Sequence, residues 1–310
     1  LLQMSRSFRL RHGACLAFVC LRALPGECFV LTPRPGLQRA GACVDSVKRY
    51  ASAGGSKGKA KIKPITAYKL LQSQGFGSRK WCKTLIETGY LHVEGEDITD
   101  PNTKLEPTEG LPYRVGDDEF QFRSKATVLL NKPVGYECSQ KPRDNPTVFE
   151  LLPAIFQERK MQPVGRLDVE TSGALLFTDD GQLNHALCSP KRGKDKVYVA
   201  TCKHALDDSI IQTLLRGVEL KDEPGVIVRA TAAEKLADDK LSLTLVEGKY
   251  HQVRRMIAAA GNRCEALHRS SFAGLEIGAE GEQLGEGQWR WVGEEELVQV
   301  LAQSKTQKAD

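Results

Sequence analysis

The stretch GRLDVETSGALLFT, residues 165–178, determines how the rest of the chain is interpreted. It places Asp168 in a polar loop bounded by glycines, directly before an apolar run at residues 174–177. Such a run predicts a buried strand, so the carboxylate is exposed in a cleft and yet held by a rigid element. A single aspartate in a loop is more often a turn residue. Its role therefore depends on the segments around it.

The segment KVYV, residues 196–199, predicts a strand that contains Tyr198. An aromatic ring beside positive charge is what nucleobase stacking requires. The positive charge comes from a cluster around the single acid Asp195, which consists of Lys191, Arg192, Lys194, Lys196 and Lys203. This strand is therefore a candidate contact for a nucleic acid.

The segment GKYHQVRRM, residues 248–256, predicts a helix with guanidinium groups at Arg254 and Arg255. Such groups pair bidentately with a carboxylate or a phosphate. An amphipathic surface helix is the alternative interpretation, because an apolar stripe is formed by Val253, Met256 and Ile257.

From residue 125 onward, short strands and helices alternate without the regular helix-per-strand spacing of a doubly wound sheet. Strands are predicted at residues 197–201 and 241–246, and a helix at residues 207–216. We expect an α+β fold with a mixed, mainly antiparallel sheet and with helices on one side of it.

A smaller module precedes this region at residues 64–110, where the pattern predicts helix, turn, helix, turn and strand. Ser78 is the predicted N-cap of the second helix. Arg79, Lys80 and Lys83 fall on the solvent face of that helix. Basic residues at a helix N-terminus oppose the dipole by a few tenths of a kcal/mol each unless they meet an anion. The alternative to an anion-binding surface is a solvated helix face.

The formal charge of +5 separates into parts with different meanings. Residues 1–63 hold twelve Lys or Arg against two acidic residues, and residues 64–275 balance at 29 against 29. The tail from residue 276 holds eight acidic residues against three basic ones. Bulk charge therefore says nothing about the folded part, and the indication for nucleic acid rests on local clusters.

Residues 1–63 are rich in arginine, poor in acids and without helix or strand periodicity, so we expect a disordered leader. Its start is similar to a secretory signal, but Arg22 interrupts the apolar stretch. An organelle transit peptide and a mispredicted extension are the other interpretations. No apolar run approaches the roughly 20 residues of a membrane-spanning helix, so we expect no membrane contact.

The nine cysteines form no C-x-x-C pair, which argues against a zinc site and against a disulfide framework. We expect the cysteines after the leader to be buried thiols in a reducing compartment: Cys82, Cys138, Cys188, Cys202 and Cys264. The chain also lacks the Gly-rich loops that bind phosphate or dinucleotides, and we predict no cofactor and no metal.

Two resemblances to known families follow from these motifs. The module at residues 64–110 resembles the S4 RNA-binding domain, on the residues SRK at 78–80 and IETGYLHVEG at 86–95. This resemblance implies that the module binds structured RNA.

The later segments together resemble the ribosomal-RNA pseudouridine synthases that have an N-terminal S4 domain. The motif G-R-L-D-x-x-[TS]-[TSC]-G-[LA]-L-[LV]-x-T-x-D-G is filled at residues 165–181, and E-G-x-x-x-[QE]-[VI]-[RK]-R at residues 247–255. Within that family, YHQVRRM followed by Leu-His-Arg is more similar to the enzymes for small-subunit (16S) ribosomal RNA than to those for the large subunit.

The resemblance implies a role for each matching residue. Asp168 is the expected nucleophile, and Tyr198 the ring that stacks on the target uracil and assists as a general base. Arg254 is expected to pair with Asp168, Leu267 to line the pocket, and Arg166 to enter the RNA helix where the uridine was. The expected RNA contacts are Arg79, Lys80, Lys83, Lys191, Arg192, Lys196, Lys249 and Arg255.

The function implied is the conversion of a uridine in ribosomal RNA, most similar to the 16S case, into pseudouridine without a cofactor. The alternatives are the same reaction on 23S ribosomal RNA and a non-catalytic RNA-binding protein of ribosome assembly. The presence of Asp168, Tyr198 and Arg254 together favours the enzyme, because a binding protein has no need of all three.

The expected organisation is a leader at residues 1–63, an S4 domain at 64–110, a linker at 111–124, a catalytic domain at 125–300 and a disordered tail at 301–310. We expect a monomer that meets ribosomal RNA within a partly assembled subunit. The expected compartment is the cytoplasm, or an organelle matrix if the leader is a transit peptide.

Overall fold

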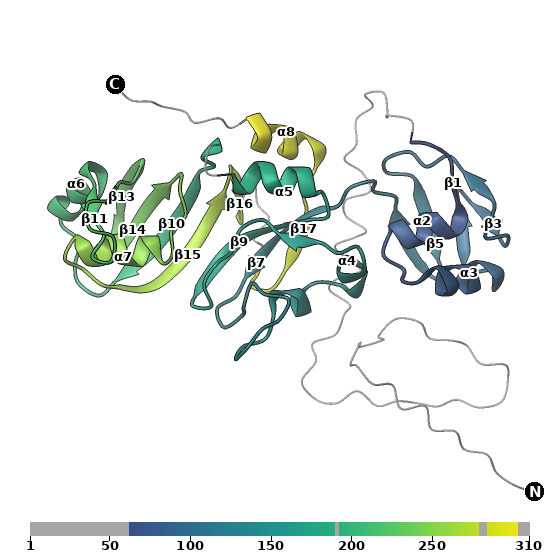
Figure 1. Cartoon of the computed structure of the whole chain (residues 1–310), viewed down its shortest axis with the longest axis horizontal. Coiled ribbons are helices and arrows are strands. Elements are labelled where there is room, and N and C mark those ends of the chain that lie inside the picture. The colour runs from purple at the N-terminus through teal and green to yellow at the C-terminus, as the bar shows by residue number, and fades with distance from the viewer. Residues whose placement is uncertain (1–61, 190–191, 279–283, 303–310) are drawn as a thin grey trace, which may run out of the picture. The chain divides into compact units, whose positions relative to one another are not determined.

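A computed structural model describes residues 62–189, 192–278 and 284–302 (Figure 1). Nearly all of the predicted leader lies outside these residues, as do Lys191 and all but two residues of the predicted tail. Within the described ranges, no helix has both the length and the apolar composition needed to cross a bilayer. The described elements form a smaller N-terminal module followed by a larger one.

The N-terminal module packs two helices on a four-stranded antiparallel sheet with the strand order β3-β2-β5-β6. Its predicted helix start is confirmed, because the Ser78 hydroxyl accepts a hydrogen bond from the Trp81 N–H. The elements are β1 (Ile65–Thr66), α2 (Ala67–Ser73), α3 (Arg79–Glu87), β2 (Leu91–Val93), β3 (Glu96–Ile98), β4 (Lys104–Leu105), β5 (Pro112–Val115) and β6 (Asp118–Gln121).

The prediction of a linker at residues 111–124 was wrong, because β5 and β6 lie there and complete the sheet of this module. Tyr113 and Phe122 are buried in its core, and the Tyr113 and Phe120 rings stack with centroids 5.5 Å apart. The acidic pair Asp117 and Asp118 belongs to the hairpin that joins the two strands. A polar pair in a turn gives the same local pattern as a polar linker.

The larger module is built on a nine-stranded sheet. Its main path is β13-β14-β10-β15-β9-β7-β17, and every pair in it is antiparallel except β9 with β15. This confirms the predicted α+β fold with a mixed, mainly antiparallel sheet. The strands are β7 (Thr127–Lys132), β8 (Gln162–Pro163), β9 (Thr171–Thr178), β10 (Lys196–Cys202), β13 (Ala232–Ala237), β14 (Lys240–Leu245), β15 (Cys264–Phe272), β16 (Leu275–Glu276) and β17 (Trp289–Trp291), with a separate pair β11 (Val218–Glu219) and β12 (Ile227–Val228).

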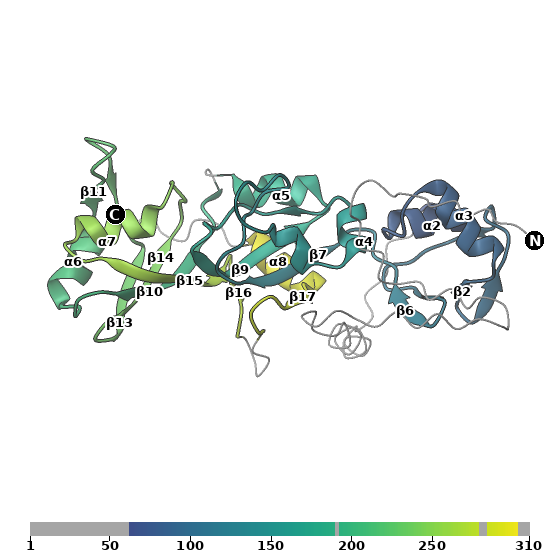
Figure 2. The same ribbon diagram turned by 90° about the horizontal axis from the view of Figure 1, so that it is seen from below.

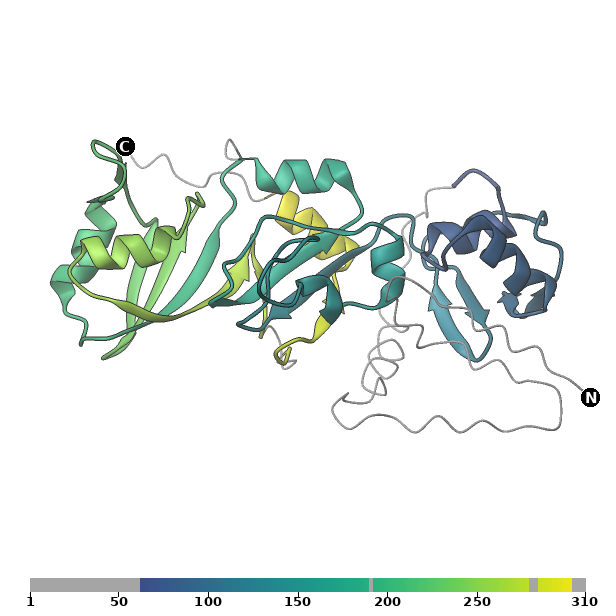
Figure 3. The ribbon, with the colours of Figure 1, turned by 60° about the horizontal axis from the view of Figure 1, so that its bottom comes forward.

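Helices cover both faces of this sheet, so the expectation of helices on one side was wrong. One core joins the sheet to α4 (Ala154–Glu158), α6 (Asp208–Arg216) and α7 (Gln252–Ala259), together with the short 3-10 helix η1 (Val148–Leu151). A second core joins the opposite face to α5 (Gly181–Cys188) and α8 (Glu294–Ala302) (Figures 2 and 3). Because both faces are covered, β7 and β9 are buried along their whole length, as continuous apolar strands usually are.

The five cysteines in the described ranges are all free. Cys82, Cys202 and Cys264 are buried as predicted, and burial raises the pKa of the Cys82 and Cys202 thiols to about 11. The prediction was wrong for Cys188, which is exposed as the last residue of α5, where its thiol bonds the Asn184 side chain.

Gly173 makes the close approach of β9 to β15 possible. Its φ is +108°, and a Cβ there would lie 2.2 Å from the backbone oxygen of Arg269.

We predict that Gly173→Ala lowers the free energy of unfolding by about 2–4 kcal/mol, because alanine adds left-handed backbone strain and overpacks the contact. Gly261→Ala is the matched control, because Gly261 has φ +88° and open space around it. Urea unfolding measures both variants, and equal losses of unfolding free energy in Gly173→Ala and Gly261→Ala would contradict this account.

Candidate active site

Asp168 lies in the loop that enters β9, and its side chain is 38% exposed. The loop is fixed through its backbone: the Thr171 N–H donates to the Asp168 carbonyl at 3.1 Å, and the Gly135 N–H donates to the Val169 carbonyl at 2.8 Å. The main chain is therefore held while the carboxylate stays accessible. This is the arrangement expected of a nucleophile on a rigid support.

Lys132, the last residue of β7, fixes this loop through hydrogen bonds to its backbone. The side chain is fully buried, and its ammonium donates to the carbonyls of Pro133 at 2.9 Å, Asp168 at 3.1 Å, Val169 at 3.3 Å and Thr171 at 2.9 Å. Burial lowers the pKa of Lys132, while Cys138 and Asp168 nearby act in the opposite direction. Lys132 is not among the site residues predicted from the sequence. The available signal is a lysine that ends a strand buried along its whole length.

The ion-pair partner of Asp168 in the structure is His251, with Nε2 3.4 Å from Oδ1. Arg254, the predicted partner, instead donates to the Glu170 carbonyl at 3.2 Å and the Cys264 carbonyl at 3.1 Å, and it pairs with the Glu170 carboxylate at 3.6 Å. The predicted contact between Arg254 and Asp168 is therefore corrected. His251 is the residue directly before α7 and lies nearer the loop, whereas Arg254 is inside the helix and stabilises the loop two residues beyond Asp168.

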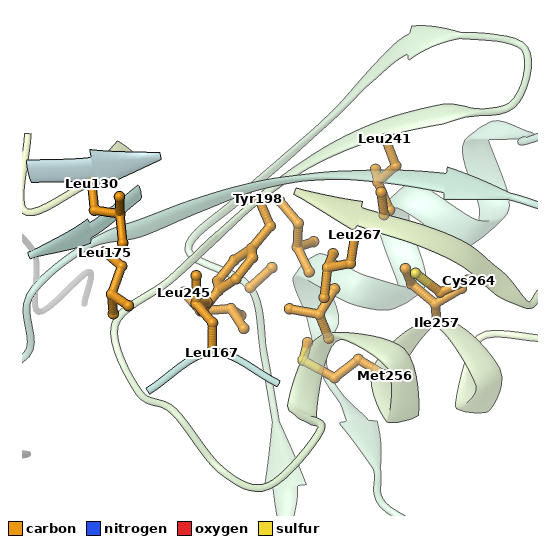
Figure 4. Packing of buried hydrophobic residues seen from close by; sticks show 14 of the residues in the cluster. Leu130, Leu167, Leu175, Tyr198, Leu241, Leu245, Met256, Ile257, Cys264 and Leu267 are labelled. Carbon is orange, nitrogen blue, oxygen red and sulfur yellow. The ribbon is translucent and has the colours of Figure 1, made fainter. Parts of the chain in front are cut away.

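Tyr198 and Leu267 are brought to the same place by the register of β10, β15 and β9. Ala200 faces Leu267, and Leu267 faces Thr171, the first residue of β9. Tyr198 and Leu267 are buried in one core with Leu167, the residue before Asp168 (Figure 4). The Leu167 N–H donates to the Cys138 sulfur at 3.5 Å. The loop thus presents an apolar side chain to the tyrosine ring and its carboxylate to solvent.

Lys196 is half-buried and hydrogen-bonded within the chain, and its predicted contact with RNA stays a prediction. Its ammonium donates to the carbonyls of Lys194 at 2.7 Å and Val246 at 3.1 Å, and burial, with Arg269 nearby, lowers its pKa to about 8. The strand places Lys196 on the same side as Tyr198, which faces the core. Lys194 is also internal, with its ammonium on the carbonyls of Val300 and Leu301 at the end of α8.

The other predicted cations differ in accessibility. Arg255 pairs with Glu223 at 3.0 Å and Asp222 at 3.4 Å, and Lys249 pairs with the same Glu223, so these two are neutralised within the chain. Lys249 and Arg255 lower the pKa of Glu223 through hydrogen bonds. The remaining described candidates are exposed or partly exposed, namely Arg79, Lys80, Lys83, Arg166 and Arg192.

In the described ranges, no group of three or more His, Cys, Asp or Glu side chains is placed to hold a metal ion.

An accessible carboxylate on a loop held through its backbone lies near a buried tyrosine of a mixed sheet, an arrangement compatible with an enzyme as well as with a binding module. Residues 126–259 match the family model for RNA pseudouridylate synthase. The chain belongs to the pseudouridine synthase family, whose members isomerise uridine in RNA.

Particular relatives support this membership. The chain is 35% identical over 218 residues to the ribosomal small subunit pseudouridine synthase A of Escherichia coli (strain K12), which covers 70% of this chain and 91% of that relative. The protein of the same name from Vibrio vulnificus is 36% identical over 224 residues, or 72% of this chain and 94% of that one. A crystal structure of a pseudouridylate synthase matches with a TM-score of 0.53 and 28% identity, over 76% of this chain and 99% of that one.

We predict that Lys132→Met lowers the free energy of unfolding by about 1–3 kcal/mol and lowers kcat more than it changes KM. The Asp168 and Val169 carbonyls would keep only their N–H donors, from Thr171 and Gly135, and the loop would lose the ammonium that ties it to β7. Lys125→Met, at an exposed lysine just before β7, is the control. A Lys132→Met enzyme with unchanged stability and kcat would contradict this role.

We predict that the free energy of unfolding rises less with pH in Lys196→Met than in the wild type between pH 8 and 10.5. The unfolded chain keeps the Lys196 proton up to its ordinary pKa of 10.5, but the folded chain releases it near pH 8. Between these values the unfolded state binds more protons, so the Lys196 contribution makes stability rise with pH. The difference in unfolding free energy between wild type and Lys196→Met should therefore shift in favour of wild type from pH 8 to 10.5. A constant difference would show that the lysine is not buried.

Proposed function

We propose that this enzyme converts a uridine of small-subunit ribosomal RNA into pseudouridine, with Asp168 as the nucleophile. The observation that supports this most strongly is the Asp168 loop itself, in which the Lys132 ammonium holds the backbone and leaves the carboxylate free. Relatives named for the ribosomal small subunit, at 35% and 36% identity, support the choice of RNA.

The reaction needs few groups. The bond from uracil N1 to C1′ breaks, the base turns, and a bond from C5 to C1′ forms. C5 loses a proton and N1 gains one, so the product is an isomer and there is no redox change. The carboxylate attacks in its ionised form. The His251 Nε2 lies 3.4 Å from its Oδ1, and the Lys132 ammonium holds the backbone carbonyl of the same residue.

The enzyme can reach the target uracil only when that nucleotide leaves the RNA helix. Extrusion of a nucleotide costs a few kcal/mol, and stacking on an aromatic ring returns about 1–3 kcal/mol. In the proposal Tyr198 receives the uracil ring and acts as the general base, and Leu267 beside it lines the pocket. Arg166, exposed two residues before Asp168, takes the place of the uridine in the RNA helix.

The N-terminal module would act as an S4 domain and bind RNA through α3. Arg79 and Lys83 lie over the ring of Tyr68, with the guanidinium carbon and the ammonium 5.0 Å and 5.5 Å from its centroid. Three basic residues in the first turns of α3, with no acidic residue in its first turn, favour an anion at this helix end.

The natural substrate would be a partly assembled small subunit, met by a monomeric enzyme in the cytoplasm, or in an organelle matrix if the leader is a transit peptide. Free thiols throughout the described ranges support a reducing compartment.

The test is a map of pseudouridine in both ribosomal RNAs from cells that lack the gene and carry either the wild-type chain or Asp168→Asn. We expect one position in the small-subunit RNA to be modified only with wild type, because the amide is not a nucleophile. Asp168→Asn should retain its RNA affinity. If the enzyme-dependent pseudouridine lies in large-subunit RNA, that RNA replaces the proposed substrate. If Asp168→Asn is active, the assignment of Asp168 as the nucleophile is wrong.

We predict that replacing Arg79, Lys80 and Lys83 with Ala weakens RNA binding and flattens the dependence of log K on log salt by up to about three. Removal of three equal charges at Arg216, Arg229 and Lys240, all exposed on the larger module, is the control. The measurement is RNA affinity at several salt concentrations. If the Arg79, Lys80 and Lys83 variant keeps the wild-type slope of log K against log salt, α3 does not bind RNA as an S4 domain would.

A further inference from the structure

Tyr250 and His251 form a stacked pair directly before α7. Their ring centroids lie 3.9 Å apart, with 17° between the planes. Tyr250 is 75% exposed, so one face of its ring is covered by the imidazole and the other is open to solvent. A ring this exposed adds little to a core, and its open face is available to stack on another flat ring.

The backbone at this pair is held in an uncommon conformation. His251 has φ +47°, in the left-handed region, which costs a residue with a side chain free energy and tends to persist at functional sites. Arg255 braces the pair twice: its N–H donates to the His251 carbonyl at 3.0 Å, and its side chain donates to the Tyr250 carbonyl at 3.2 Å. Arg255 is itself fixed by Glu223.

The imidazole connects this pair to the nucleophile. One face of the His251 ring stacks on Tyr250, and its Nε2 lies 3.4 Å from Asp168 Oδ1. Two other cations near the loop are engaged elsewhere: Lys132 with backbone carbonyls, and Arg254 with Glu170. In the described part of the chain, His251 is therefore the side chain that pairs with the nucleophile.

We propose that the Tyr250–His251 pair is a platform for a nucleobase of the substrate RNA next to the target uridine, and that His251 is a positioning residue for Asp168. This rests on the proposed function. Extruding one nucleotide leaves its neighbours without a stacking partner, and the open tyrosine face beside the pocket replaces that partner. A base stacked on Tyr250 would contact the ring that stacks on His251, and His251 in turn contacts the Asp168 carboxylate.

The test uses the full chain and small-subunit particles isolated from cells that lack the gene and labelled with tritium at uracil C5. Tritium release under single-turnover conditions measures the reaction, and binding of the same particles measures affinity. His251→Gly removes the ring and relieves the left-handed backbone, so it should fold. His251→Gln keeps an amide N–H near the position of Nε2.

We expect His251→Gly to slow the single-turnover rate at least tenfold with little change in affinity, and His251→Gln to restore most of that rate. A merely structural role predicts the opposite, since Gly suits this backbone better than Gln. A wild-type rate in His251→Gly, or a Gln variant as slow as the Gly variant, would overturn the positioning role.

For the platform, we expect Tyr250→Phe to bind the particles like wild type and Tyr250→Ala to bind about 5- to 100-fold more weakly. Leu236→Ala is the matched control, because Leu236 is another exposed apolar residue, 51% exposed on the edge strand β13. Unchanged binding by Tyr250→Ala, or an equal loss in the control, would overturn the platform.

Wild-type behaviour separates this inference from the proposed function. A wild-type chain that releases no tritium from the particles overturns the proposed substrate, and the inference about its RNA with it. Normal wild-type release with unaffected Tyr250 and His251 variants overturns the inference alone.

Discussion

The active site depends on one buried ammonium group. A charged lysine without water must find hydrogen-bond acceptors inside the protein, and Lys132 finds them in the backbone carbonyls of Asp168, Val169 and Thr171. The loop conformation is thereby tied to β7 without use of the Asp168 side chain. The Asp168 carboxylate, the proposed nucleophile, can face solvent because the backbone, not the side chain, makes the structural hydrogen bonds.

The sheet determines what lies beside this loop. Side chains alternate between the two faces of a strand, so the register of β10, β15 and β9 places Tyr198 and Leu267 on the face that Leu167 covers. The parallel pairing of β9 with β15 needs Gly173, where any side chain would meet the backbone of Arg269. The apolar surroundings of the Asp168 loop are thus a consequence of strand pairing.

Most of the positive charge near the site is used within the protein. Arg254 stabilises the loop at Glu170, Lys249 and Arg255 pair with Glu223, and Lys196 binds carbonyls. Exposed positive charge remains at residues such as Arg166 and Arg192, and on α3 of the N-terminal module.

The sequence by itself determined the features that local patterns specify: the Ser78 cap, the mixed α+β fold and the Asp168 loop before a buried strand. Only the tertiary structure decided which groups meet. An acidic pair in a hairpin has the same local pattern as a linker, and β5 and β6 are recognised only by their pairing with β2. The burial of Lys196 and the choice of His251 over Arg254 as the partner of Asp168 depend on which strands and helices pack together. Contacts between residues 80 or more positions apart leave no periodicity in the chain.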